Sequence, residues 1–499
     1  MSPDGGNHVN NTGQRGRKSD HEAYQLLFCA ALLGTAVLTA CSGAEKVKSN
    51  TPVQITMWNY YNGAQKEEMD RLVQEFNDTV GLEQKIVVES VSKGSVSELE
   101  DELRDSMNGK TGSDPLPDFC SAYADAAYDL WKKDKISDFR PYLTDEEYDN
   151  YISAYLEEGN FGTNAAMMIF PVAKSTEVLT INSTAWEPFA SETGASLEEL
   201  STWEGLAQTA KAYYEWTDAK TETPNDGQAF FGRDSFANYI LVGSYQLGHT
   251  IYSGENGSIS VNVDPDTMRR LWDNFYVPYI SGYYLENGRF RSDDLKTGKL
   301  IAYVGSSSGA VYASDQVTYD DGSTETIRCD ILPLPGFAGA SSCAVQQGAG
   351  AVMFRTDEKK EKAVVTFLKW LTREDNNIPF CTASGYLPVT KAASDVERCI
   401  SCMKEQNLEL NPNVETMLKT AIPQVKEYSL YTTTPFPGAQ DARKVIDSTL
   451  PERARADRQK VLELISSGMS LETAVSECNT EEAFESWCED TKAQLRNLK

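Results

Sequence analysis

The residue types that most often perform catalysis are scarce or unspecific in this chain. It contains three histidines, and because His8 and His21 lie in an N-terminal segment that we expect to be removed, only His249 is left. One histidine permits a Ser-His-Asp triad but no metal site built from several imidazoles. We expect no metal and no cofactor. The 74 acidic residues make a pair of carboxylates for glycoside hydrolysis easy to propose and therefore unspecific. The sequence has no HExxH motif or phosphate-binding glycine loop.

Aromatic and hydroxyl side chains that follow apolar segments are better candidates, and they suit binding. Trp58, Tyr60 and Tyr61 come at the end of one such segment, and a run of serines begins at Ser306. Aromatic rings stack on the C–H faces of sugars. Hydroxyl and backbone donors bind an anion or a sugar hydroxyl at little desolvation cost. Trp58 fits a core as well as a pocket, and we expect at least one of Tyr60 and Tyr61 to face the ligand.

Alternating segments would position these side chains. Three β-rich segments enclose two helical ones: residues 53–61, 64–77, 85–91, 99–107 and 116–124. This β-α-β-α-β order predicts a parallel sheet covered by helices, the α/β class. Ligands of such sheets bind at the carboxyl ends of the strands, so we expect the loops that begin at Trp58 and Tyr123 to border the site.

The remainder of the chain also contains strand-like and helical segments. Further strand-like runs occupy residues 167–182, where two runs are joined by AKST, and residues 300–311, 329–336 and 348–354. An amphipathic helix carries Val364, Phe367 and Leu371, and the chain is helical and charged from about residue 451. About 450 residues are too many for one simple core, so we expect two lobes.

The N-terminal segment has the pattern of an export signal. Its apolar run from Leu26 to Ala40 is about fifteen residues long, short of the roughly twenty that span a bilayer, and basic residues precede it. It ends in Leu38-Thr39-Ala40-Cys41, which resembles the bacterial lipobox, in which Cys41 is acylated. We therefore predict a lipoprotein signal peptide over 1–40 and a flexible tether over 41–51. The alternative is an ordinary cleaved signal followed by an incidental cysteine.

Charge and cysteine content agree with a location outside the cell. Residues 1–40 carry equal numbers of acidic and basic side chains, so the net charge of −28 belongs to the remainder and disfavours nucleic-acid partners. Eight cysteines follow Cys41, an even number that permits disulfides in an oxidising exterior. Cys399 and Cys402 have the spacing of a redox motif, but no thioredoxin-like strand precedes them, which favours a structural role or free thiols.

Four stretches resemble one known family. They are ITMWNYYNGAQKEEMDRLVQEFN at 55–77, PVAKSTEVLTIN at 171–182, VGSSSGAV at 304–311 and FLKWLTREDNNIPFCTASGYLPVTKAA at 367–393. In order and spacing they are similar to the family 1 extracellular solute-binding proteins of ABC importers, the group that includes maltose-binding protein. GYLPVTKAA and SSSG are most like the glycerol-phosphate-binding branch. The resemblance covers nearly all of residues 52 to 450.

The resemblance implies a two-lobed periplasmic-binding-protein type II fold whose lobes are joined by crossing hinge strands. Residues 171–182 would form the first crossing and about 329–347 the second. Lobe one would then be 52–172 plus 347–388, and lobe two 173–346 plus 389–499. The protein would be a monomer and not an enzyme, bound to the extracellular face of the membrane through Cys41. Its partners would be a small solute (sugar, polyol or glycerol-phosphate-like) and the ABC permease subunits.

The resemblance also implies a set of solute-binding residues. Carried over onto matching positions, they are Ser175, Ser306, Ser307, Ser308, Gly348, Tyr386 and Arg443. Ser175, Ser307, Tyr386 and Arg443 are expected to converge on one polar or anionic group. Two positions depart from the glycerol-phosphate branch, whose Tyr and Glu fall on Val96 and Ala124; Asp125 is then the nearest acid.

Two other function classes were compared with solute binding. A secreted glycoside-acting hydrolase would use a pair of carboxylates. A structural or adhesive surface lipoprotein would leave the Ser/Gly loops after the strands without a role. Turnover of oligosaccharides by the purified protein would separate the hydrolase from a binding protein.

Overall fold

The first of two main sheets is built from the N-terminal segments and one late strand. A computed structural model describes residues 51–161, 166–255, 258–432 and 435–498. The sheet has the order β2-β1-β3-β14-β4, with bounds β1 (Val53–Asn59), β2 (Ile86–Ser92), β3 (Phe119–Ala122), β4 (Ile136–Ser137) and β14 (Gly350–Phe354). β1 runs parallel to β2 and β3, as predicted for the N-terminal alternation, whereas β14 is antiparallel to both of its neighbours.

Helices cover this sheet because their apolar residues recur at helical spacing. In α1 (Gly63–Asp78), Met69, Leu72, Val73 and Phe76 are buried and the remaining positions are mostly charged or polar. The other helices of this half are α2 (Val80–Gln84), α3 (Val96–Met107), α4 (Ala124–Lys132), α5 (Asp145–Asp149), α6 (Ser153–Glu157), α12 (Glu358–Leu371) and α13 (Glu374–Ser384). Trp370 packs against Phe76 in the core beneath α1 and α12.

The second main sheet is mixed and has the order β12-β5-β9-β6. Its strands are β5 (Glu177–Asn182), β6 (Phe231–Arg233), β9 (Ala302–Ser306) and β12 (Cys329–Leu332). β5 is antiparallel to β12 and β9, and β6 is parallel to β9. Its helices are α7 (Ser183–Thr193), α8 (Trp203–Asp218), α9 (Phe236–Gln246), α10 (Pro265–Ser281), α11 (Arg291–Lys296), α16 (Ala439–Ser466), α17 (Leu471–Cys478) and α18 (Glu481–Arg496).

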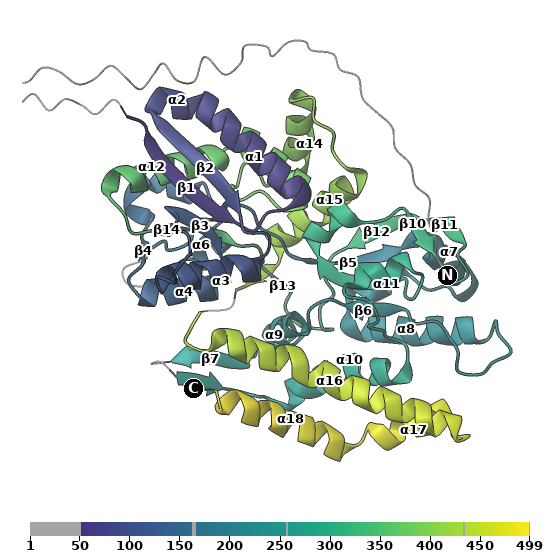
Figure 1. Cartoon of the computed structure of the whole chain (residues 1–499). Helices are drawn as coiled ribbons and strands as arrows, with labels where there is room; N and C mark the ends of the chain where they lie inside the picture. The colour runs from purple at the N-terminus through teal and green to yellow at the C-terminus, as the bar shows by residue number, and fades with distance from the viewer. Residues whose placement is uncertain (1–50, 162–165, 256–257, 433–434, 499) are drawn as a thin grey trace, which may run out of the picture. The chain divides into compact units, whose positions relative to one another are not determined.

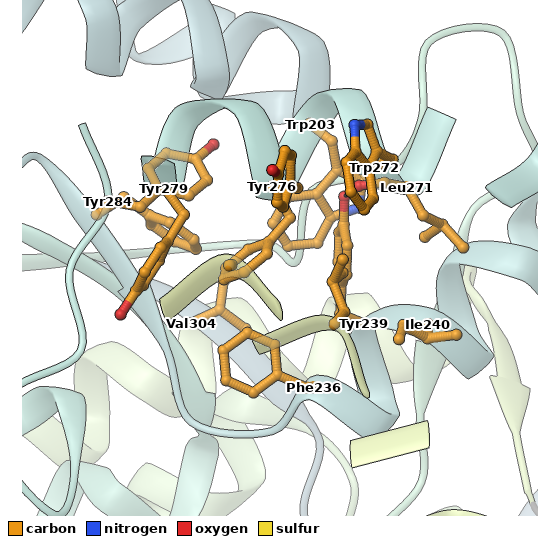
Figure 2. Packing of buried hydrophobic residues seen from close by; sticks show 14 of the residues in the cluster. Trp203, Phe236, Tyr239, Ile240, Leu271, Trp272, Tyr276, Tyr279, Tyr284 and Val304 are labelled. Carbon is orange, nitrogen blue, oxygen red and sulfur yellow. The ribbon is translucent and has the colours of Figure 1, made fainter. Parts of the chain in front are cut away.

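The core of this second half is rich in aromatic rings. Trp203, Tyr239 and Trp272 lie close together in Figure 2, and the rings of Trp272 and Tyr276 stack with centroids 3.6 Å apart. The long helix α16 packs across α9 and α10, with α17 and α18 beside it, at the lower edge of Figure 1. The C-terminal helix α16 therefore packs against helices that precede it by about two hundred residues.

Smaller elements complete the described chain. They are α14 (Val396–Glu405), α15 (Pro412–Glu427), the 3-10 helices η1 (Arg140–Tyr142), η2 (Leu197–Ser201) and η3 (Ser307–Tyr312), and the strands β7 (Tyr252–Glu255), β8 (Ser258–Val261), β10 (Gln316–Thr318), β11 (Thr324–Thr326), β13 (Cys343–Val345) and β15 (Ser429–Tyr431). Leu418 on α15 and Val178 on β5 belong to a third, smaller core.

Three distant segments meet where the chain passes between the two halves. Ser175 and Gln347 exchange backbone hydrogen bonds of 2.9 and 2.8 Å, and Lys174 pairs with Leu387. Of the two strand-like runs predicted in 167–182, only the second forms a strand, β5. The first is limited to isolated bridges such as Phe170 with Ala351, because Pro171 lacks the N–H that a ladder needs. The lobe boundaries predicted from the resemblance fall within these paired segments and stay a prediction.

The predictions for the N-terminal segment and for the cysteines can be compared with the described residues only in part. The signal peptide, Cys41 and all of the tether except Thr51 lie outside the described residues. In the part of the chain that is described, no helix is long and apolar enough to cross a membrane. All eight cysteines there have free thiols, including Cys399 and Cys402, which are buried on α14.

Candidate functional site

A cleft of about 410 Å³ is lined by side chains from both halves of the structure. Tyr123 and Asp125 begin α4 beside the first sheet, whereas Ser306 ends β9 of the second sheet. Arg443 is the fifth residue of α16 and comes more than two hundred and fifty residues after Ser175. Only the folded chain brings these groups into one cavity.

The structure brings most of the predicted site residues to this cleft. Those in its lining are Tyr123, Asp125, Ser175, Ser306, Gly348, Tyr386 and Arg443. Ser308 also lines the cleft, whereas its neighbour Ser307 does not. Ser307 is 1% exposed and its hydroxyl accepts a hydrogen bond from the backbone N–H of Thr176, so it joins η3 to β5 behind the lining.

Three predicted aromatic residues lie outside the lining. Trp58 belongs to β1, which is buried on both faces at this point, and the ammonium group of Lys93 lies 3.8 Å from the centre of its ring. Tyr61 packs edge-on against Phe380. Tyr60 is also buried, and its ring stacks on Tyr123 with a centroid distance of 6.4 Å. Neither Tyr60 nor Tyr61 lines the cleft, contrary to the expectation for this pair; the separately predicted Tyr123 does, and Tyr60 packs against its ring.

Two tyrosines form the aromatic side of the cleft. Tyr123 is 37% exposed, and Tyr386 follows Gly385, which ends α13 with a positive φ of 68°. Tyr60 lies beside both side chains: its ring stacks on that of Tyr123, and its hydroxyl influences the pKa of Tyr123 and of Tyr386. Burial raises the pKa of Tyr123 to about 12, so its hydroxyl stays protonated and can donate to a ligand.

A chain of buried polar groups holds Arg443 in place. Its Nη2 donates to Asn238 Oδ1 at 2.7 Å, and Asn238 Nδ2 donates to Glu177 Oε1 at 2.8 Å. Arg233 Nη2 in turn donates to Glu177 Oε2 at 3.2 Å. Burial raises the pKa of Glu177, and the contacts of this carboxylate with Arg233 and Asn238 lower the pKa in part. Because Asn238 uses its carbonyl for Arg443, the guanidinium has a fixed position at the cleft.

Asp125 gives the cleft a carboxyl group that titrates near neutral pH. Burial raises its pKa to about 6, and the charge of Arg443 acts in the opposite direction. Asp129, Glu100 and Glu158 add smaller upward effects through their negative charges. Arg443, whose charge lowers the pKa of Asp125, thus comes from α16, whereas Asp125 itself is in the first turn of α4.

A buried ion pair lies beside the cleft at the crossing segments. Lys174 is fully buried and its ammonium group contacts the carboxylate of Glu158, which lines the cleft. The same ammonium group donates to the carbonyl oxygen of Gly348 at 2.8 Å. Gly348 has a φ of 96°, and a Cβ there would lie 2.7 Å from the carbonyl oxygen of Ala173. The pair therefore joins two crossing segments and fixes the backbone on which Ser175 and Gly348 lie.

Several lining residues were missed from the sequence. Asn238 lies in the apolar run of α9, where nothing distinguishes it from a helix-surface amide. Glu158 ends a short helical stretch and carries no local signal. Gln346 and Gln347 immediately precede Gly348 in the motif QQGAG, so their proximity to a predicted site residue could have identified them.

The groups in the lining are suited to binding and poorly suited to covalent chemistry. Hydroxyl and amide side chains line the cleft, and the charged lining residues are Asp125, Glu158 and Arg443. His249 is outside the lining and lies 3.7 Å from Asp264 in an exposed position. Across residues 51–498, leaving aside the undescribed gaps, no group of three or more His, Cys, Asp and Glu side chains is arranged to hold a metal ion.

Residues 71–405 match the model of the protein family described as bacterial extracellular solute-binding protein. No curated protein sequence matches the chain. The chain is similar in structure to the cyclic α-maltosyl-1,6-maltose binding protein of Arthrobacter globiformis, with a TM-score of 0.60 and 16% identity over 89% of this chain and 100% of that one.

Two further solved structures are similar over comparable lengths. UgpB of Mycobacterium tuberculosis, in complex with glycerophosphocholine, has a TM-score of 0.59 and 16% identity over 88% of this chain and 98% of that one. The maltose-binding protein MalE of Listeria monocytogenes, in complex with maltose, has a TM-score of 0.58 and 13% identity over 89% and 97%. These similarities show that the chain has the two-lobed periplasmic-binding-protein fold, as the sequence predicted.

Proposed function

Because the chain belongs to the family of bacterial extracellular solute-binding proteins, we propose that it captures a carbohydrate in the cleft and delivers it to an ABC permease. The observation that carries this proposal is the cleft itself. Hydroxyls, amides, one cation and two carboxylates from both halves of the fold line one cavity of about 410 Å³. A sugar offers hydroxyls that both donate and accept, and C–H faces that stack on rings such as that of Tyr123.

The structural neighbours support this solute class. Those from Arthrobacter and Listeria are described with maltose-type saccharides, whereas UgpB is described with glycerophosphocholine. A glycerol-phosphate diester is therefore the second candidate, and Arg443 favours it because a guanidinium can bind phosphate through two hydrogen bonds. Asp125, whose pKa is influenced by the charge of Arg443, counts against it, since an ionised carboxylate repels phosphate.

A thermal-shift screen tests the proposed function. A ligand that binds only the folded state stabilises it by about 2.7 kcal/mol at one hundred times its Kd. The panel should contain neutral oligosaccharides, polyols and glycerophosphodiesters. We expect the largest shift from an oligosaccharide. If no compound of the three classes raises the melting temperature, the proposed function is wrong.

The hydrolase alternative has one observation in its favour, the carboxyl groups of Asp125 and Glu158 in the same cleft. Glu158, however, is bound to the ammonium group of Lys174 and is therefore poorly placed to attack a sugar. Incubation of the protein with the saccharides from the screen, followed by chromatography, distinguishes the two functions. We expect the saccharides to be recovered intact, and products formed at catalytic rates would favour the hydrolase.

The proposed receptor is a monomer held at the outer face of the cell membrane by a lipid on Cys41. Its support is the Leu-x-Ala-Cys pattern at the end of a short apolar run. Changing Cys41→Ala should release the protein into the medium, and mass spectrometry of the membrane-bound form should find a diacylated N-terminal cysteine. An unmodified N-terminus at another position in the membrane-bound protein would contradict the anchor.

A further inference from the structure

Gln346 has a buried amide in the lining of the cleft for which the fold provides no hydrogen-bond partner. The side chain is 6% exposed, and neither its Oε1 nor its Nε2 is hydrogen-bonded. Other described side chains have single unpartnered buried atoms, but Gln346 alone among them has two, and it alone lines the cleft. Buried polar groups in folded proteins are almost always paired, so this amide requires an explanation.

The backbone around Gln346 is fixed, so a local shift does not relieve the amide. Its N–H donates to the carbonyl oxygen of Tyr431 at 3.0 Å, and Val345 before it pairs with Tyr431 in the β13–β15 ladder. Gln347 after it pairs with Ser175 in the crossing segments. The side chain therefore stands on a backbone that is held on both sides, in the region where the two halves meet. A partner for it has to come from outside this backbone.

The chemistry of an amide limits what that partner can be. Oε1 accepts hydrogen bonds and Nε2 donates them, so full pairing needs a group that does both. A hydroxyl satisfies this requirement, whereas the ionised oxygens of a phosphodiester group accept hydrogen bonds but donate none. The charges nearby leave no excess of positive charge for an anion, because Asp125 in the lining opposes Arg443 and Glu158 is neutralised by Lys174. Lys174 is already bound to Glu158 and adds no free cation.

We propose that Gln346 is a specificity-determining residue whose amide pairs with a hydroxyl of an uncharged solute when the cleft is occupied. The inference rests on the proposed solute-binding function and deepens it. The fold itself provides no hydrogen-bond partner for the amide. In the complex the solute supplies both a donor and an acceptor, so the lost hydrogen bonds are regained through binding.

The ligand-free protein gives the first test. Gln346→Met keeps the length of the side chain and removes the unpaired amide, so we expect a higher melting temperature than in the wild type. Gln316→Met is the matched control, because Gln316 is exposed on β10, and it should melt within one degree of the wild type. A lower melting temperature for Gln346→Met would show that the amide is already paired in the empty protein, and would overturn the proposal.

Calorimetric titration with maltose and with glycerophosphocholine gives the second test. The wild type should bind maltose more tightly, Gln346→Met should bind it at least tenfold more weakly, and Gln316→Met should match the wild type. A structural residue would lose stability and affinity together, whereas here stability rises while affinity falls. Equal maltose affinity in Gln346→Met overturns the role of Gln346. Binding of glycerophosphocholine alone overturns it and leaves solute binding intact, and binding of neither probe contradicts the proposed function as well.

Discussion

Replacing Lys174 by methionine should destabilise the protein through the buried ion pair at the crossing segments. The Lys174 side chain is fully buried and that of Glu158 is 8% exposed, so water screens neither charge. Lys174→Met would leave the carboxylate of Glu158 buried without its cation, and Gly348 would lose the hydrogen bond to its carbonyl oxygen. Removing one partner of a buried pair typically costs about 3 to 5 kcal/mol.

The expected change in melting temperature follows from the size of the compact unit, residues 52–499. With an unfolding entropy of about 2.1 cal/mol/K for each of about 450 residues, a loss of 3 to 5 kcal/mol lowers the melting temperature by roughly 3 to 5 °C. Differential scanning calorimetry measures this shift directly. Lys66→Met is the matched control, because Lys66 pairs with Asp70 on the exposed surface of α1 and such pairs contribute about 1 kcal/mol or less.

A second substitution separates charge from packing. Glu158→Gln combined with Lys174→Met removes both charges and keeps similar side-chain volumes, so it should recover most of the stability that Lys174→Met loses. If Lys174→Met melts no lower than Lys66→Met, the reasoning about this pair is wrong. If the double variant is no more stable than Lys174→Met, the loss comes from packing around Lys174 and the charge argument fails.

Three further outcomes are expected. The pKa of Asp125 is raised to about 6, so its ionisation lowers the folding stability as the pH rises from about 4 through 6. The Asp125→Asn variant should therefore match the wild type in melting temperature near pH 4 and exceed it above pH 6. A difference in melting temperature that stays constant with pH would contradict this. Gly348→Ala should lose about 1 to 3 kcal/mol in urea unfolding, more than Gly194→Ala, because both have positive φ but only Gly348 also faces a backbone oxygen. A bound saccharide should reduce the radius of gyration measured by X-ray scattering through closure of the two lobes, and an unchanged profile at saturation would count against a hinge.

The N-terminal half of the fold could be predicted because its signals are local. The helical spacing of Met69, Leu72 and Phe76 and the β-rich runs around them specify α1 and its neighbouring strands within a short window. For residues 167–175, the same kind of short apolar pattern predicted a strand, but the structure has only isolated bridges there. The pairing partners of these residues are Ala351, Gln347 and Leu387, roughly 170 to 210 residues further along the chain, and no local pattern encodes such pairing.

Residues of the candidate site could be predicted where a sequence motif contained them. They could not be predicted where the burial of a side chain determines whether it reaches the cleft. Ser175, Gly348 and Arg443 were placed by their motifs, and the structure brings them to one cleft. Trp58 and Tyr61 resemble pocket residues in the sequence, but Trp58 lies on the buried strand β1 and Tyr61 packs against Phe380, so their rings fill the core. Asn238 reaches Arg443 through a contact across 205 positions of the chain, which only the folded structure reveals.

The most direct test of the account is calorimetric titration of the best saccharide from the screen into the wild type and into the double variant Tyr123→Ala/Arg443→Ala. Tyr123 offers a ring for stacking and Arg443 a charged donor, and both line the cleft. We predict one solute per protein and affinity at least one hundredfold weaker in the double variant, about 2.8 kcal/mol. Arg328→Ala, which removes a guanidinium from an exposed ion pair with Glu187, should bind as the wild type does. Unchanged affinity in the double variant would place the solute elsewhere and contradict the account.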